Sequence, residues 1–176
     1  DEAPDFAVYG LAEPGSALAD APDLYVIKHC FPKERNQKAW GLDVGSEATR
    51  RTAVEQAVDS GEPTITGKIT LVQDDGRHTG FLYLVPVYKN GKDHSTPEER
   101  RANLVGLAYC PIILENGVGG MEALAGDLAD FEVYDGSVIK PESLLYDHDG
   151  CLVQAGGSDA SGGRRRFVEV KNLTVG

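Results

Sequence analysis

Basic residues are scarce in this chain, and long apolar runs are absent. The 17 lysines and arginines face 28 aspartates and glutamates, which leaves a net charge of -11 over 176 residues. Nucleic acids and anionic membrane surfaces attract clustered Lys and Arg, so we expect neither as a partner. No stretch approaches the roughly 18 apolar residues of a membrane-spanning helix. The hydrophobic fraction of 41% predicts a globular chain with one good core or two small subdomains.

Cysteine and histidine motifs are equally sparse. The cysteines Cys30, Cys110 and Cys151 lie far apart, and neither a Cys-x-x-Cys pair nor a His-x-x-x-His spacing occurs. We therefore expect no metal site and no cofactor. Cys30 and Cys110 each end an apolar segment, so they either bridge two adjacent strand ends or remain free thiols. The sequence leaves both options open.

The usual catalytic patterns are also missing. There is no G-x-S-x-G elbow, no G-x-G-x-x-G loop and no conspicuous carboxylate pair. Residues 147–150 begin like a calcium loop but lack the distal bidentate Glu, so they predict a turn. We expect no catalytic residue in this chain. It has neither a signal peptide nor an initiator Met, which predicts a fragment of a longer protein.

The most informative element that is present is a patterned helix at residues 46–60. Ser46 is its expected N-cap, and Gly61 ends it. One arginine and three apolar residues recur at i, i+4, i+7 and i+8 and so share a face: Arg50, Val54, Ala57 and Val58. Arg51 shares a different, solvated face with Glu55 and Asp59. Arg50 therefore points at the core, whereas Arg51 has no special role.

A guanidinium on a buried face is costly unless an anion meets it. The functional interpretation of Arg50 is a ligand carboxylate or phosphate, held by the planar guanidinium. The structural alternative is a partner within the protein, for which Asp43 is the nearest candidate in the sequence.

Several apolar segments around this helix predict strands. They are residues 6–9, 24–31, 64–73, 81–88 and 104–114. Residues 81–88 are almost wholly apolar, which predicts a central strand that is covered on both faces. Gly106 predicts close approach by another group.

The connections carry their own signals. Asp75-Gly76 is a hairpin turn signal. Ser95 or Thr96 is the expected cap of a short helix that starts at Pro97.

The character of the sequence changes after residue 116. The glycines at 117, 119 and 120 predict a joint, and four short strand candidates follow it at residues 130–134, 143–146, 151–154 and 167–173. We therefore predict an α/β (α+β) protein with two subdomains. Residues 1–116 form the larger one, and residues 117–176 form a smaller, β-rich one.

Several of these motifs, in order, resemble a CHASE domain. They are Tyr25-Val-Ile-x-x-x-Phe-Pro, Gly41-Leu-Asp43, Arg50-Arg51-x-Ala53, the segment with Gly61 and Thr66, Pro86-Val-Tyr88, Arg100-Arg101 and Leu104-Val-Gly106. CHASE domains are extracellular sensors of membrane-bound histidine kinases and nucleotide cyclases, such as diguanylate cyclases, and include the plant cytokinin receptors. The resemblance implies two PAS-like subdomains with antiparallel sheets, a ligand in the membrane-distal one, and a homodimer. The family's long N-terminal helix is missing from this chain.

The resemblance also implies a set of ligand-contacting residues. Arg50 stands where cytokinin receptors carry an Asp that holds the adenine ring, so the charge is inverted. Thr66, Val72 and Leu84 fall at positions that line the receptor pocket. We expect polar contacts from Thr66 and the backbone of Val72, and apolar walls from Leu84 and Ala108.

These observations predict the periplasmic or extracellular portion of an inner-membrane receptor that binds a small ligand, such as a carboxylate. The alternative is a module that recognises a partner protein, with a tightly filled, vestigial pocket and an exposed apolar patch instead. Arg50 facing open volume would favour the sensor, whereas Arg50 locked to Asp43 in a solid core would favour the alternative. An enzyme would require a titratable pair in a cleft, which the sequence does not offer.

Overall fold

The computed structural model describes residues 5–74, 79–125, 131–136, 138–147 and 171. The chain divides into two compact units, with the boundary between Ile112 and Ile113. Both contain helices and antiparallel strand pairs, so the predicted mixed α/β class is confirmed. No helix within the described ranges is both long and apolar enough to cross a membrane.

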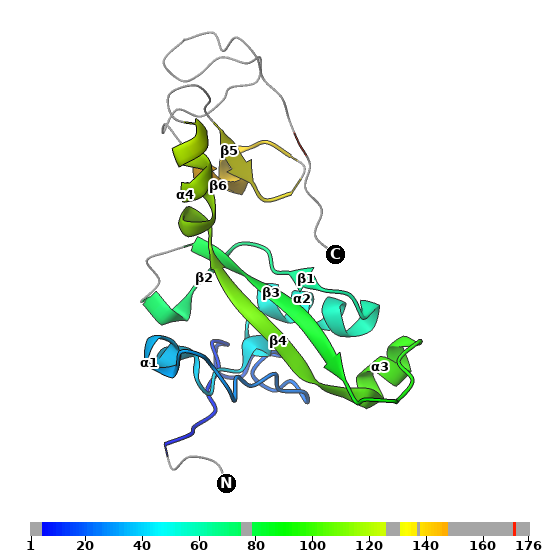
Figure 1. The fold of residues 1–176 in the computed structure, drawn as a ribbon. Helices are drawn as coiled ribbons and strands as arrows, with labels where there is room; N and C mark the ends of the chain where they lie inside the picture. The colour runs from blue at the N-terminus through cyan, green and yellow to red at the C-terminus, as the bar shows by residue number, and fades with distance from the viewer. Residues whose placement is uncertain (1–4, 75–78, 126–130, 137, 148–170, 172–176) are drawn as a thin grey trace. The chain divides into compact units, whose positions relative to one another are not determined.

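The first unit is built on a four-stranded sheet with one long strand in the middle (Figure 1). The strands are β1 (Thr64–Ile65), β2 (Ile69–Thr70), β3 (Thr79–Tyr88) and β4 (Leu104–Ile113). Both β1 and β2 pair antiparallel with β3, and β4 pairs with β3 as well. The prediction of a central strand at residues 81–88 is confirmed. Phe81, Leu82 and Leu84 of β3 are buried in the core.

The single strand predicted at residues 64–73 is wrong, because the chain breaks into β1 and β2 around Thr66. The Thr66 N–H donates to the carbonyl of Leu82, and the Thr66 hydroxyl accepts from the N–H of Leu82 at 2.9 Å. A side chain thus replaces one backbone acceptor, which shifts the register between β1 and β2. After β2 the chain turns into the short helix η3 (Val72–Asp74). The predicted Asp75-Gly76 turn lies outside the described residues.

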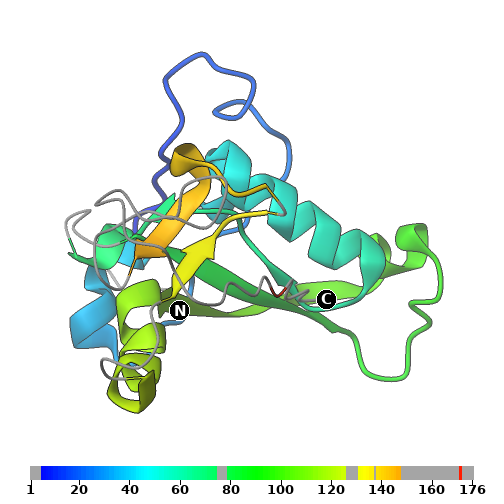
Figure 2. The same cartoon turned by 90° about the horizontal axis from the view of Figure 1, so that it is seen from above.

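Helix α2 (Ala48–Ser60) packs against β1 and β3 and covers one face of the sheet (Figure 2). Its predicted buried face is confirmed, since all four of its residues are at most 5% exposed: Arg50, Val54, Ala57 and Val58. Gly61 ends the helix with a left-handed φ of 78° and donates to the carbonyl of Ala57.

The predicted N-cap of α2 is wrong by one residue. The Glu47 carboxylate accepts from the N–H groups of Thr49 and Arg50 and is the cap. The Ser46 hydroxyl instead donates to the carbonyl of Asp43 and accepts from the N–H of Leu11. Ser46 ends the short helix η2 (Val44–Ser46), so its hydroxyl fastens that turn to the N-terminal segment.

The connection between β3 and β4 carries helix α3 (Pro97–Asn103), as predicted. Of the two candidate caps, Thr96 is the one used, and it forms a capping box with Glu99. Two arginines fasten α3 to the end of α2. Arg100 Nε donates to the carbonyl of Asp59, and Arg101 pairs with the Asp59 carboxylate at 2.7 Å.

Two predicted strands in the N-terminal part are wrong. Residues 6–9 and 24–31 form only single bridges, Tyr9 with Leu42 and Val26 with Asp43. The intervening chain after residue 31 makes short turns, α1 (Lys33–Asn36) and η1 (Gln37–Ala39), before it reaches Leu42. A strand requires an extended partner along its length, and residues 41–44 supply only a short one.

The second unit holds α4 (Leu114–Ala125), β5 (Glu132–Tyr134), the short helix η5 (Pro141–Ser143) and β6 (Leu144–Asp147). The strands β5 and β6 pair antiparallel and confirm two of the four short candidates. The candidate at 151–154, and that at 167–173 apart from residue 171, lie outside the described residues. The predicted glycine joint is wrong, because Gly117 and Gly120 lie within α4, whose Leu114 and Val118 are buried.

Candidate functional site

The first unit contains a groove of about 1110 Å³ between two stretches of chain. One wall is the segment 22–31, and the other is formed by β4 from Leu104 to Tyr109. Buried apolar side chains from two further elements line it deeper down: Val54 and Val58 of α2 and Leu84 of β3. The helix, the central strand and an edge strand thus converge on one apolar space.

The walls of the groove mix apolar side chains with polar and charged ones, which include Asp23, Lys28, His29 and Arg101. Leu24, Phe31 and Val105 line it although they are 55%, 95% and 66% exposed. Arg101 lies where β4 begins. Towards the other end, burial raises the pKa of Tyr109 to about 12, with smaller contributions from Cys30 and Tyr9. A groove with an apolar floor and mixed walls suits an amphipathic occupant better than a small hydrophilic ion.

Two of the predicted contact residues meet in this groove, and three do not. Leu84 lies among its deep lining residues, and Ala108 lies on the β4 wall. Arg50, Thr66 and Val72 are elsewhere in the first unit. Thr66 is only 2% exposed, and its hydroxyl is bonded within the sheet. Val72 is half-buried and begins η3.

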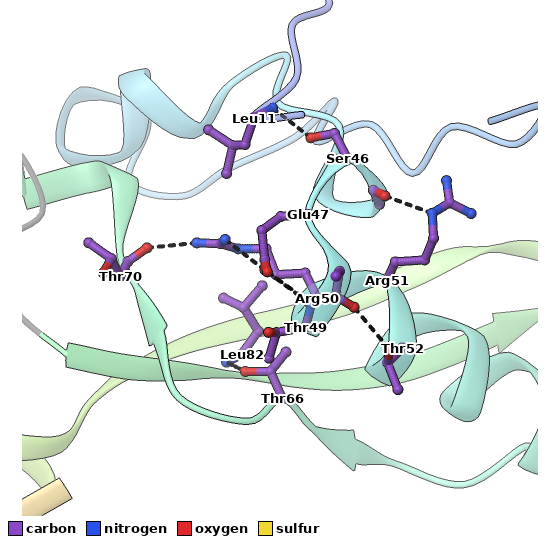
Figure 3. Close-up of polar contacts among 12 residues, drawn as sticks. Leu11, Ser46, Glu47, Thr49, Arg50, Arg51, Thr52, Thr66, Thr70 and Leu82 are labelled. Carbon is purple, nitrogen blue, oxygen red and sulfur yellow. Dashed lines mark hydrogen bonds and ion pairs between the residues drawn. The ribbon is translucent and has the colours of Figure 1, made fainter. Parts of the chain in front are cut away.

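Arg50 reaches from α2 to the end of β2 and is bonded within the protein (Figure 3). Its Nη2 donates to the carbonyl of Thr70 at 2.6 Å, and its Nη1 pairs with Glu47 at 3.2 Å. Burial lowers the pKa of Arg50, and Glu47 opposes that shift. Arg50 therefore has an internal partner, but it is Glu47 rather than the expected Asp43. The Asp43 carboxylate instead accepts from the N–H groups of Tyr25 and Gly45.

Glu47 is the ion-pair partner of Arg50, and the sequence analysis did not identify it. Burial raises its pKa, but hydrogen bonds from the Thr49 and Arg50 backbones and the Arg50 charge outweigh burial, so the pKa is lowered overall. One carboxylate thus caps α2 and neutralises the buried guanidinium. The signal was present, since Glu47 precedes Arg50 by three residues, the spacing at which helical neighbours meet.

Comparison with known proteins places this arrangement in a family. A model of the CHASE domain matches residues 1–146. The chain belongs to the CHASE family. Such domains are the sensor domains of signalling receptors, and the matched range includes the whole groove. The predicted resemblance is confirmed.

The CHASE domain is also similar to the hybrid signal transduction histidine kinase A of Dictyostelium discoideum. The two are 28% identical over 136 residues, which is 73% of this chain and 6% of the kinase. The CHASE domain therefore spans a small part of that relative's length.

Two further expectations, for Arg51 and for Gly106, are wrong. Arg51 is not simply solvated: its Nε donates to the carbonyl of Gly45 and its Nη2 to that of Asp23, while it also pairs with Glu55. It therefore fixes the start of α2 to the segment that forms one groove wall. Gly106 has open space around it, whereas a Cβ on Gly80 would lie 2.4 Å from the carbonyl oxygen of Ile112.

The two cysteines of the first unit are free thiols, Cys30 half-buried and Cys110 exposed. Cys151 lies outside the described residues. Within the described part of the CHASE domain, no three His, Cys, Asp or Glu side chains gather closely enough to hold a metal ion.

Proposed function

We propose that this CHASE domain is the extracytoplasmic sensor of a transmembrane receptor and that its groove binds a small ligand. The single observation that carries this is the groove itself, with its buried apolar floor of Val54, Val58 and Leu84. Its volume of about 1110 Å³ lies just above the range of about 300–1,000 Å³ that is usual for ligand pockets. The partner-recognition alternative predicted a filled pocket, an exposed apolar patch and Arg50 locked in a solid core. The open groove favours the sensor. The internal partners of Arg50 and the exposed Leu24, Phe31 and Val105 are what the alternative expects.

The first unit would be the membrane-distal, ligand-binding part of the sensor, and the second unit the membrane-proximal part. The similar hybrid histidine kinase supports a kinase as the output of the parent protein. In that arrangement the domain lies outside the cytoplasm, the parent is anchored in the inner membrane, and two copies form a homodimer. Binding in the groove shifts the equilibrium between two conformations of the receptor.

Two kinds of ligand are consistent with the residues of the first unit. The apolar groove favours a ligand whose bulk is hydrophobic, with Leu84 and Ala108 as contacts. The expectation of an anionic ligand rests on Arg50, with polar contacts from Thr66 and the backbone of Val72. A guanidinium has five N–H donors, so Arg50 can keep Glu47 and Thr70 and still donate to a ligand. This second mode requires the ligand to reach Arg50 from outside the groove.

A thermal-shift screen against carboxylates, amino acids and purines tests both modes, since a ligand of the folded state raises the melting temperature. We expect a hit whose shift disappears in Ala108→Phe, which fills the groove, and persists in Val87→Phe. Val87 is 43% exposed and does not line the groove. A shift lost in Arg50→Gln but kept in Ala108→Phe would move the site to Arg50. No shift from a folded sample would overturn the ligand-binding proposal.

A further inference from the structure

A tyrosine at one end of the groove has a hydroxyl group that the protein does not use. Tyr109 lines the groove on the β4 wall and is half-buried. Within the described part of the chain, its side chain forms no hydrogen bond. The hydroxyls of Tyr9 and Tyr88, by contrast, donate to the backbone carbonyls of Lys38 and Val58. A tyrosine hydroxyl that is withdrawn from water normally finds a partner, so the Tyr109 hydroxyl is available to a ligand.

The protonation state of this hydroxyl determines which ligand group it can meet. Burial raises the pKa of Tyr109 to about 12, so the phenol keeps its proton throughout the neutral pH range. A protonated phenol donates a hydrogen bond, and it cannot form an ion pair with a cation. The matching ligand group is therefore an acceptor oxygen, such as that of a carbonyl or a carboxylate.

The chain around this end of the groove is basic, although the whole chain is acidic. Residues 28–38 hold four lysines and arginines and a single glutamate, and Lys28 itself lines the groove. Tyr9 connects this segment to Tyr109, because the Tyr9 hydroxyl bonds the carbonyl of Lys38 and Tyr9 is close enough to influence the ionisation of Tyr109. The local charge thus favours an anion here, in a chain whose net charge of -11 repels anions elsewhere.

The opposite end of the groove has no such excess of positive charge. Arg101, just before β4, donates to both carboxylate oxygens of Asp59 at 2.7 Å. Asp23 also lines the groove, and both Asp23 and Arg101 are close enough to Tyr25 to influence its ionisation. The guanidinium at this end is therefore balanced by carboxylates, which places the anionic group of a ligand at the Tyr109 end.

Between its two ends the groove is largely apolar. Aliphatic side chains line its floor and the β4 wall: Val54, Val58, Leu84, Val105 and Ala108. From Leu104 to Tyr109 the β4 backbone advances about 17 Å, at 3.3–3.4 Å per residue. An elongated hydrocarbon body that starts at Tyr109 would cover this surface, and removing apolar surface from water is the main source of affinity in such a site.

We propose that the groove binds an elongated monocarboxylate, of the class of medium-chain fatty acids. Its carboxylate accepts a hydrogen bond from the Tyr109 hydroxyl beside the basic segment 28–38, and its hydrocarbon chain lies along β4 over the apolar floor. The inference rests on the proposed function and names the class of ligand for that site. It assigns the anion to Tyr109 rather than to Arg50, whose guanidinium already bonds Glu47 and Thr70.

Calorimetric titration of residues 1–176 with butanoate, hexanoate, octanoate and decanoate tests the ligand class. We expect the affinity to rise about fourfold with each added CH₂ group, which is the gain from burying one. Octanamide, which keeps the acceptor oxygen but loses the charge, should bind more weakly than octanoate, and octylamine more weakly still. An affinity that does not depend on chain length, or octylamine binding as tightly as octanoate, would overturn the proposal.

A matched pair of variants tests the role of Tyr109. Tyr109→Phe removes one oxygen that forms no bond within the described chain, so its melting temperature without ligand should stay close to that of the wild type. Its affinity for octanoate should fall roughly 10- to 100-fold, the usual effect of losing a hydrogen bond to a charged group. Tyr83→Phe, at a half-buried position on β3 that does not line the groove, should bind octanoate like the wild type. Equal affinities in the two variants would overturn the proposal.

Further outcomes separate this inference from the proposed function. A purine or an amino acid that binds in place of the carboxylates, and is lost in Ala108→Phe, would support the sensor function and overturn the inference. Octanoate binding that is lost in Arg50→Gln but kept in Tyr109→Phe would place the anion outside the groove and also overturn the inference. A folded protein that binds none of these compounds would overturn both.

Discussion

Arg50 makes the first unit depend on a single buried cation. It joins the start of α2 to the end of β2 through Glu47 and the Thr70 carbonyl. Its side chain is 6% exposed, so solvent cannot replace either contact if the guanidinium is removed. The two contacts therefore hold the start of the helix against the end of β2, beyond the break between β1 and β2.

Removing this side chain should destabilise the fold. We expect Arg50→Ala to lower the free energy of unfolding by about 1–3 kcal/mol, the usual cost of losing hydrogen bonds to a buried charged group. Urea unfolding followed by circular dichroism measures this. Thr52→Ala is the matched control, since Thr52 is exposed on the same helix. An unchanged midpoint for Arg50→Ala would show that the pair contributes nothing to stability.

Glu47 should give the fold an acid-sensitive component. Its pKa is lowered in the folded state from an ordinary value of 4.5. Its contribution is therefore complete above that value and is lost as the pH falls through the lower, folded pKa. The stability difference between the wild type and Glu47→Gln should shrink as the pH falls below 4.5. Unfolding curves from pH 3 to 7 test this, with Glu62→Gln as background. A difference that grows towards acid would contradict the assignment.

At the scale of elements, Gly80 leaves no room for a side chain between β3 and β4. A Cβ there would stand 2.4 Å from the Ile112 carbonyl oxygen and 2.8 Å from Leu71 Cδ1. One of these contacts is backbone and cannot rotate away. The missing side chain at Gly80 therefore lets the central strand lie close to both β4 and the core.

Two glycine substitutions in neighbouring strands should therefore have opposite outcomes. We expect Gly80→Ala to lower the melting temperature, at a cost of about 1–3 kcal/mol from overpacking. Gly106→Ala in β4 meets open space and should change stability by less than about 0.5 kcal/mol. Thermal unfolding of both variants measures the difference. Equal losses would show that the close approach at Gly80 is not maintained in solution.

Local patterns predicted the elements that need only local contacts. The buried face of α2 follows from a repeat of 3.6 residues, and the capping box of α3 from Thr96 and Glu99. The N-cap of α2 was missed because Ser46 bonds Leu11, 35 residues away, which no local pattern contains. The strand predicted at 24–31 does not form, because an alternating pattern reports only strand propensity, whereas strand pairing needs an extended partner.

The same limit applies to the candidate site. Leu84 and Ala108 were placed in one pocket by family resemblance, and they do line one groove. The buried face of Arg50 indicated an anionic partner, and the resemblance placed that partner on a ligand, but burial alone does not say which anion meets a cation. Glu47 was overlooked because Asp43 was taken as the internal partner, although Glu47 precedes Arg50 by three residues at the start of the same helix.

For the molecule as a whole, the acidic excess is the dominant long-range term. A net charge of -11 makes the compact chain repel itself. We expect the melting temperature to rise when NaCl is increased from about 0.01 to 0.15 M, since the screening length falls from about 30 to 8 Å. An equal osmolality of sucrose is the control for excluded-solute effects. A fall in melting temperature with salt would mean that ion pairs such as Arg101 with Asp59 outweigh the repulsion.

The anchored connection between β3 and β4 has a practical consequence. Its tip at Asn90 and Gly91 is exposed. Its base is held by the Thr96 capping box and by Arg100 and Arg101 of α3, which bond Asp59 at the end of α2. Exposed tips of this kind accept inserted domains. A circularly permuted fluorescent protein placed between Asn90 and Gly91 would be joined to both strands that border the groove. The sensor could then report its own occupancy as a change in colour, before its natural ligand or its output is known.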